Sequence, residues 1–323
     1  MRNILIGFTL FAVSGLAQAA KVPGPLVGSD WLAKNMKNVV ILDVRKDVKS
    51  FTAKPVINVD KKTRKMKVAR VGGHIPGAVL VDYGKIRGKK KEGGAVFEKM
   101  LLGKKAMEDL IQAHGVNADS AVVIVSKGES NLDMTGATRL YWQLKYYGHD
   151  NMAVLDGGVA QWLVDGHKVS ISKSAPTRGN WKATAERTEI LATSEDVARA
   201  VKDKSVQLVD NRPLNQYLGA TYKKSYVYAP GHVPGAKSFP NELLTKAGAP
   251  AKFNAPGELT SLSRAMGIDP KKPSIAYCNS GHLATGGWFY MSEVMGNKNV
   301  KMYDGSMHQW TKEKRPTVTM KME

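Results

Sequence analysis

An internal repeat constrains this chain more than any other feature. Three motifs occur twice in the same order: Leu42–Arg45 and Val209–Arg212, Gly73–Ala78 and Gly231–Ala236, Leu155–Trp162 and Tyr303–Trp310. The copies are 167, 158 and 148 residues apart. A period of this length is far longer than that of a solenoid repeat, so it indicates two copies of a whole domain. The total of 323 residues also suits two domains of about 150 residues each.

Each copy alternates short apolar runs with amphipathic segments. Residues 136–147 and 285–294 have helical periodicity, and Gly296 follows the second as a stop signal. Strands that alternate with helices predict an α/β fold in which each copy is a mainly parallel sheet covered by helices on both faces. The runs that predict buried strands are 39–42, 121–125, 152–155, 206–209, 274–277 and 300–303.

The first residues predict an export signal. Arg2 precedes an apolar stretch over 4–16, and Ala17 and Ala19 form the small-x-small pattern that a signal peptidase needs. An uncleaved anchor is the alternative. The stretch is too short to span a bilayer comfortably, so we expect cleavage near Ala19, an exported, periplasmic protein and no stable membrane insertion.

The expected organisation has four parts. The signal peptide covers 1–19, a first domain covers 20–172 and a second domain covers 190–323. Between the two domains, the polar residues 173–189 include Pro176 and Gly179, which is typical of a linker.

Charge and cysteine content limit the classes of function. The chain has 48 Lys and Arg against 28 Asp and Glu, a net charge of +20 that favours anionic partners. Its single cysteine excludes a disulfide framework and cysteine-rich metal sites. Basic residues crowd two stretches of the first copy, which we interpret as solvated loops or hairpins; a dedicated binding site is the alternative. Because the chain is expected to be exported and these runs lack interleaved aromatic residues, they do not predict nucleic-acid binding. These residues are Lys61, Lys62, Arg64, Lys65, Lys67 and Arg70, then Lys85, Arg87, Lys89, Lys90 and Lys91.

The single cysteine is the candidate nucleophile. Cys278 follows a predicted strand and precedes a predicted helix, at the sheet edge where α/β proteins bind ligands. A tight loop that enters a helix turns backbone N–H groups towards one point, and Gly281 permits a sharp turn there. A cysteine at that point is expected to be a nucleophilic thiolate at neutral pH. The loop has the residues Asn279, Ser280, Gly281, His282, Leu283 and Ala284.

Other interpretations of the cysteine are weaker. A free cysteine is often only a small buried apolar residue, but the strand–loop–helix position argues against that role. A cysteine phosphatase needs an arginine six residues after the nucleophile, where this chain has Ala284. A zinc site of Cys278, His232 and His282 lacks metal-like spacing, so no metal is expected.

Taken together, the motifs resemble those of the tandem-domain rhodanese family of sulfurtransferases. The shared features are the two-copy layout, Asp-x-Arg after the first strand, Gly-His-x-Pro-Gly-Ala, the strand–Cys–loop–helix and the closing Asp-Gly-Ser-x-x-x-Trp. In that family the second domain carries the cysteine and the first is catalytically silent. Ser126 stands in the first copy where Cys278 stands in the second.

The resemblance implies a two-step transfer of sulfur that needs no cofactor. Cys278 would take sulfur from a small anionic donor such as thiosulfate as a persulfide, and a thiol, cyanide or a protein acceptor would remove it. The loop amides would stabilise the persulfide charge. Asp210 and Arg212 would either contact the substrate or form an ion pair that supports the strand end.

Departures from the family pattern leave the donor open. Asn279 and Ser280 are neutral where members that prefer thiosulfate often carry basic residues, and Gln216 stands where members that prefer mercaptopyruvate have a second arginine. His282 has no counterpart in the first copy, so it either supplies a proton or positive charge or faces solvent. His74 and His232 occur in both copies, which favours a structural role in the turn.

Two other classes of function are alternatives. The neutral loop and basic first copy would also suit a carrier that holds sulfur, or a related chalcogen, and hands it to a partner without turnover. A structural pseudoenzyme is disfavoured because the single cysteine occupies the family's active position.

Overall fold

The computed structural model describes residues 21–63 and 66–320 of the chain. The predicted signal peptide with its cleavage site at Ala19 lies outside the described residues, as do Arg64 and Lys65. Among the helices of the described residues, none is both long and apolar enough to cross a membrane.

Each copy of the repeat forms a five-stranded sheet in which all neighbouring strands are parallel. The first sheet has the order β1 (Leu26–Val27), β9 (Met152–Leu155), β8 (Val122–Val125), β2 (Val40–Arg45), β5 (Val79–Asp82). The second has the order β10 (Leu191–Ala192), β14 (Val300–Tyr303), β13 (Ser274–Tyr277), β11 (Gln207–Asp210), β12 (Lys237–Ser238). The predicted fold of two mainly parallel sheets is therefore confirmed.

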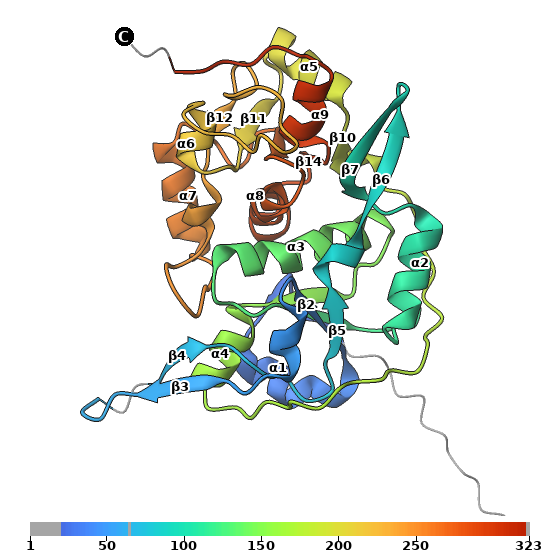
Figure 1. Ribbon diagram of the computed structural model, residues 1–323, viewed down its shortest axis with the longest axis vertical. Helices are drawn as coiled ribbons and strands as arrows, with labels where there is room; N and C mark the ends of the chain where they lie inside the picture. Colours follow the sequence, from blue (N-terminus) through green and yellow to red (C-terminus); the bar gives the residue numbers. More distant parts are fainter. Residues whose placement is uncertain (1–20, 64–65, 321–323) are drawn as a thin grey trace, which may run out of the picture.

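Helices cover both faces of each sheet (Figure 1). The outer face of the first sheet packs against α1 (Ser29–Asn35) and α4 (Gly158–Val164). The outer face of the second packs against α5 (Ser194–Asp203) and α9 (Ser306–Lys312). Between the sheets lie α2 (Lys104–Ala113), α3 (Asn131–Tyr146), α7 (Pro256–Ala265) and α8 (Leu283–Phe289). The short α6 (Leu214–Tyr217) follows β11.

Strand periodicity decides which apolar side chains enter which layer. Ile41 and Val123 belong to the outer core of the first sheet, whereas the next residues along each strand, Leu42 and Ile124, belong to the central core. Successive side chains of a strand point to opposite faces, so a strand buried on both faces is apolar throughout. The same central core also contains Val209 and other strand residues of the second sheet, so the two copies share one core.

Contact between α3 and α8 occupies the middle of the molecule. Twelve residues of α3 and all seven residues of α8 are buried. The hydroxyl oxygens of Thr138 and Thr285 lie 3.0 Å apart across the contact. A Cβ atom at Gly286 would lie 2.7 Å from side-chain atoms of both Thr135 and Leu244, so glycine allows the close approach of the helices.

The two basic stretches of the first copy lie on antiparallel hairpins, except for Lys85, which lies in the short turn Tyr83–Ile86 just before the second hairpin. One hairpin pairs β3 (Val56–Val59) with β4 (Met66–Arg70), and the other pairs β6 (Arg87–Glu92) with β7 (Ala95–Leu101). The solvated position predicted for the lysines is confirmed for the described ones, because Lys61, Lys62, Lys67, Lys85, Lys89, Lys90 and Lys91 are all exposed. It is wrong for Arg87, which is partly buried and contacts the second copy.

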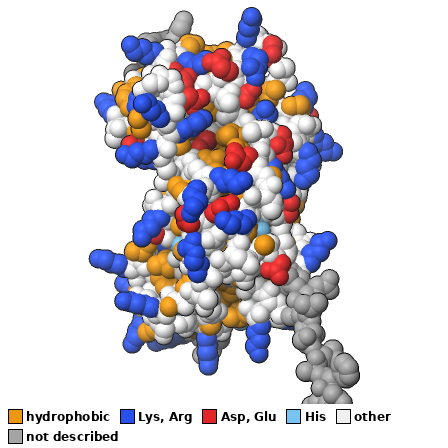
Figure 2. All heavy atoms as spheres, turned by 90° about the vertical axis from the view of Figure 1, so that its right-hand side faces the viewer, with side chains coloured by type: hydrophobic (Ala, Val, Ile, Leu, Met, Phe, Trp, Pro, Cys, Tyr) orange, Lys and Arg blue, Asp and Glu red, His pale blue; other side chains and the backbone are white. Residues whose placement is uncertain are grey.

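On one face of the molecule the basic side chains are spread rather than gathered (Figure 2). On the face in Figure 2, Lys and Arg side chains are distributed over the upper and lower parts of the molecule.

Residues 173–189, the predicted linker between the two copies, run along the surface and contact the first copy. Trp181 is 1% exposed there, and its N–H donates to the carbonyl of Val116 at 3.1 Å.

Gly286→Val should lower the free energy of unfolding by about 1–3 kcal/mol, because the added methyl groups overpack the contact between α3 and α8. Gly257→Val is the matched control: Gly257 also lies in a helix, but a Cβ atom there meets nothing within 4 Å. Urea unfolding of both variants measures the difference. Equal stabilities of the two variants would show that the helix contact has room to adjust.

Candidate active site

A pocket of about 540 Å³ lies beside Cys278 and is lined by residues of both copies. Cys278 directly follows β13, so the thiol lies at the carboxyl edge of the second sheet. The residue is only 1% exposed, which places it at the base of the pocket. The lining from the first copy includes Lys46, Tyr83 and Arg87.

The loop from Cys278 to α8 turns sharply, as the sequence predicts. Gly281 has φ +66, in the left-handed region that glycine enters without a steric penalty. A Cβ atom there would lie 2.5 Å from a carboxylate oxygen of Asp304. Helix α8 begins at Leu283, which lines the pocket, and Ala284 is fully buried in its first turn.

Ser306, which the sequence analysis did not single out, holds this loop. Its hydroxyl oxygen accepts hydrogen bonds from the backbone N–H of Cys278 at 3.0 Å and of Gly281 at 3.1 Å. The hydroxyl donates to the carbonyl of Tyr303 at 2.8 Å. The serine in the closing Asp-Gly-Ser motif was the only available signal, since the first copy has Gly158 at this place.

Three loop amides remain available to a ligand. Within the described part of the chain, the backbone N–H groups of Asn279, Ser280 and His282 donate to no acceptor. Unpaired N–H groups near a sulfur atom can stabilise negative charge on it. The loop therefore has the donors expected of an anion-stabilising turn.

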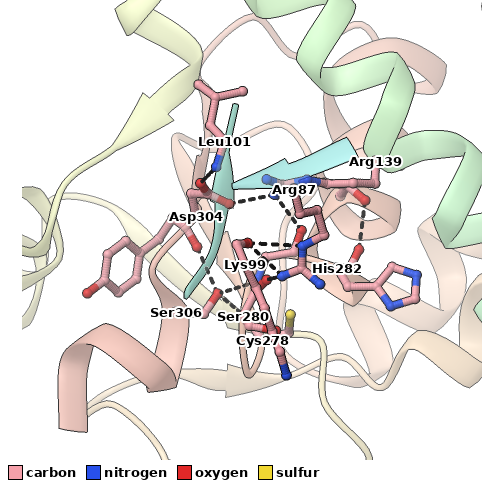
Figure 3. A network of polar contacts seen from close by, with 12 residues as sticks. Arg87, Lys99, Leu101, Arg139, Cys278, Ser280, His282, Asp304 and Ser306 are labelled. Atoms are coloured by element: carbon pink, nitrogen blue, oxygen red, sulfur yellow. Dashed lines mark hydrogen bonds and ion pairs between the residues drawn. The ribbon is translucent and has the colours of Figure 1, made fainter. Parts of the chain in front are cut away.

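Two arginines of the first copy hold carbonyl groups of this loop (Figure 3). The Nη2 of Arg87 donates to the carbonyl of Ser280. The Nη1 of Arg139, on α3, donates to the carbonyl of Gly281 at 2.8 Å and forms an ion pair with Asp304. Because a trans peptide is planar, Arg139 also directs the N–H group that follows Gly281 away from the guanidinium.

The pocket has an excess of positive charge. Four basic side chains, Lys46, Arg87, Lys99 and Lys223, line it, with Glu242 as the one carboxylate of the lining. Burial lowers the pKa of Lys46, and the charge of Arg87 lowers it further, although Asp133 opposes the change. Burial and the charge of Arg87 likewise lower the pKa of Lys99. An anion in the pocket would relieve this repulsion, so the site suits an anionic ligand.

Asp210 and Arg212 form a buried ion pair at the end of β11. Their closest atoms, Oδ2 and Nη2, are 2.6 Å apart, and Nη2 also donates to the carbonyl of Gly231 at 2.8 Å. Asp43 and Arg45 repeat this arrangement in the first copy, which has no cysteine. The repetition favours the supporting role over substrate contact, and the cations for a ligand come largely from elsewhere.

His282 contacts residues of the first copy. Its Nδ1 lies 3.5 Å from Lys46 Nζ and its Nε2 lies 3.2 Å from the Thr135 hydroxyl. Burial, followed by the charges of Lys46, Arg87 and Arg139, lowers the pKa of His282 well below its usual value. A lowered pKa favours the neutral imidazole, which argues against the expectation that His282 supplies a positive charge. Its contacts with Lys46 and Thr135 exclude a purely solvent-facing side chain.

Other predicted residues take structural positions. The Nδ2 of Asn279 donates to Gln216 Oε1 at 2.7 Å, so the glutamine orients the loop side chain. The ring of His232 stacks on Tyr217 with centroids 3.8 Å apart. Among the described residues, no group of three His, Cys, Asp or Glu side chains could hold a metal ion.

Ser126 occupies the corresponding position in the first sheet. It is fully buried, and its hydroxyl donates to the sulfur of Met134 at 3.4 Å.

A second, larger pocket of about 870 Å³ lies near the amino ends of β11 and β13 and is lined in part by Lys204, Lys237 and Lys272. Its described lining has no cysteine, histidine or carboxylate, so the pocket at Cys278 is the better candidate.

The sequence matches the Rhodanese-like domain family over residues 29–165 and 193–313. It is 31% identical over 254 residues to thiosulfate sulfurtransferase of Bos taurus, covering 77% of this chain and 80% of that protein. The fold is similar to that of a 3-mercaptopyruvate sulfotransferase from Escherichia coli, with a TM-score of 0.70 and 24% identity over 88% of this chain and 98% of that one.

A second similar structure is the anaerobic ergothioneine biosynthesis enzyme from Chlorobium limicola. Its TM-score is 0.73 at 20% identity, and the match covers 92% of this chain and 71% of that chain. Both structural similarities concern the fold.

Acidification should reveal the neutral His282. In the unfolded chain this histidine protonates below about pH 6.5, whereas the folded ring resists protonation, so stability falls as pH drops through that value. Between pH 7.5 and 5.5, His282→Asn should lose about 1 kcal/mol less unfolding free energy than the wild type. Denaturant unfolding at both pH values measures this difference, and identical losses would mean that the ring is protonated in the folded protein.

Proposed function

The chain belongs to the rhodanese-like family and is a sulfurtransferase, and from this we propose that it transfers sulfane sulfur from a small anionic donor such as thiosulfate through a persulfide on Cys278. The observation that carries the proposal is the position of the single cysteine at the base of a pocket lined by four cations. No metal or organic cofactor takes part in this chemistry.

In the first step the Cys278 thiolate attacks the outer sulfur of thiosulfate. A sulfur–sulfur bond forms to Cys278, the sulfur–sulfur bond of the donor breaks, and its electron pair leaves with sulfite. The persulfide then carries the negative charge that the thiolate lost. The free N–H groups of Asn279, Ser280 and His282 are placed to stabilise that charge.

In the second step an acceptor takes the outer sulfur. Cyanide attacks it to give thiocyanate, or a thiol attacks it to give a new persulfide and a proton, and the Cys278 thiolate is restored. The two half-reactions together return the protein to its starting state, so turnover needs no external reductant. A protein thiol could also accept the sulfur if it entered the pocket.

The pocket favours a small anionic donor over a bulky ligand. Because Cys278 is 1% exposed, only a small molecule or a slender group reaches its sulfur. The cations Lys46, Arg87, Lys99 and Lys223 would attract an oxyanion and hold it while the outer sulfur meets the thiolate.

We further propose that the protein is exported and periplasmic. The support is the basic, apolar and small-x-small order of the first nineteen residues. Mass spectrometry of the protein from its native cells should find Ala20 at the amino terminus. An intact Met1 on the protein recovered from those cells would contradict export by cleavage.

Cys278→Ser should abolish thiocyanate formation from thiosulfate and cyanide, by about 1,000-fold or more, because an alcohol at this place has no activating base. The assay follows thiocyanate with equal amounts of wild type and variant. Residual turnover near the wild-type rate in the variant would exclude Cys278 as the nucleophile.

The matched control is Ser126→Ala in the first copy, where the buried hydroxyl donates to the sulfur of Met134 and, within the described chain, to no other side chain. We expect wild-type turnover in this variant, within about twofold. If the wild type gains one sulfur atom by mass but produces no thiocyanate, the carrier function replaces the enzymatic one.

A further inference from the structure

The β6–β7 hairpin of the first copy is fixed to the second copy. The backbone N–H of Leu101 donates to a carboxylate oxygen of Asp304 at 2.6 Å, and that of Glu98 donates to His308 Nε2 at 3.2 Å. From the other side, Lys312 Nζ donates to the carbonyl of Val96 at 2.7 Å. These bonds hold the hairpin against the segment from Asp304 to Lys312, which also carries Ser306, the residue that supports the cysteine loop. Residues at the base of the hairpin therefore have a defined place beside the site.

A bulge in this hairpin aims Arg87. The register shifts so that Gly88 pairs with Met100 and Lys89 pairs with Glu98, which leaves Lys99 as the extra residue. Lys99 has φ +63, a left-handed backbone conformation that residues other than glycine rarely adopt. Its carbonyl consequently accepts two hydrogen bonds from Arg87, from Nε at 3.0 Å and from Nη2 at 2.7 Å.

The remaining bonds of Arg87 leave one donor free. A guanidinium has five N–H groups. Three donate to the carbonyls of Lys99 and Ser280, and one on Nη1 donates to the Tyr83 hydroxyl at 3.3 Å. The fifth, also on Nη1, has no acceptor among the described residues. Arg87 lines the same pocket as Cys278.

Arg87 differs from the other arginines near the loop. Arg212 is fully buried and bound by Asp210, and Arg139 is fully buried and bound by Asp304. Arg87 is partly buried and has no carboxylate within ion-pair distance in the described chain. Its guanidinium is therefore not paired with a carboxylate: Asp304 attracts it only from a longer distance and is itself paired with Arg139. The loop beside Arg87 is neutral at Asn279 and Ser280.

We propose that Arg87 is a specificity-determining residue that binds the oxyanion part of the sulfur donor, a sulfonate or carboxylate group, beside Cys278. The catalytically silent copy thus supplies the recognition of the donor through its hairpin, while the second copy supplies the nucleophile. This inference rests on the proposed function, because it assigns the donor site of the same reaction.

Alkylation of Cys278 tests the assignment without turnover. Iodoacetate and iodoacetamide modify the same sulfur, and only iodoacetate carries a carboxylate; with one cysteine in the chain, each rate reports on Cys278 alone. The measurement is the ratio of the iodoacetate rate to the iodoacetamide rate in the wild type, R87Q, R87K and the control K89Q. Lys89 lies on the same hairpin, exposed and paired with Glu98, so K89Q changes the charge equally at a distance from the pocket.

We expect R87Q to lower this ratio about tenfold and R87K to lower it less, with K89Q unchanged. Thermal unfolding confirms that each variant is folded; if R87Q is not, R87K decides through the same ratio. The thiosulfate KM should rise in R87Q more than kcat falls. If R87Q lowers both alkylation rates equally, the ratio stays constant and Arg87 only positions the loop. If R87Q changes neither rate, Arg87 makes no contact with the anion. Either result overturns the proposal. Absence of thiocyanate turnover in the wild type would instead refute the proposed function, whatever the alkylation ratios.

Discussion

The site depends on the packing of α3 against α8. Both helices are buried between the two sheets, and the threonine hydroxyls and Gly286 at their contact allow a close approach. Because α8 begins at the end of the cysteine loop, the packing of α3 against α8 places side chains of α3 beside that loop. Arg139 reaches the Gly281 carbonyl from α3, and Thr135 reaches His282. The shared core therefore makes the first copy one wall of the pocket beside Cys278.

The two copies share one scaffold and differ at the position that Cys278 occupies in the second copy and Ser126 in the first. Both keep the buried Asp–Arg pair and the same backbone bonds to the turn: Val159 N–H donates to the Ser126 carbonyl as Met307 N–H donates to that of Cys278. They differ in the supporting residue, since Gly158 stands where Ser306 holds the loop amides. The scaffold is common to both copies, and the loop support and nucleophile belong to one.

Sequence patterns predicted the parts of the molecule that local rules determine. The six apolar runs became strands within a few residues of the expected bounds, because burial on both faces requires continuous apolar residues. Cys278 and Gly281 also lie where the strand–loop–helix pattern places them. The pocket cations could not be predicted in this way. Arg87 reaches Ser280 across 193 residues, and its aim depends on a bulge at a lysine with no turn signal. The same distance explains His282, whose lowered pKa arises first from burial and then from cations on other elements.

Depth of the thiol adds a last constraint on the proposed cycle. Cys278 is nearly inaccessible as a thiol, so the donor must be small enough to reach the base of the pocket. A sulfur–sulfur bond is about 2 Å long. If the persulfide extends along the pocket, its outer sulfur therefore lies nearer to the pocket opening than the Cys278 sulfur does. An acceptor then needs to penetrate less far than the donor did. The pocket can thus select strictly for the donor while it accepts a wider range of acceptor thiols. The proposed selection for an anionic donor by Arg87 of the first copy acts at the base of the pocket, where space is most limited.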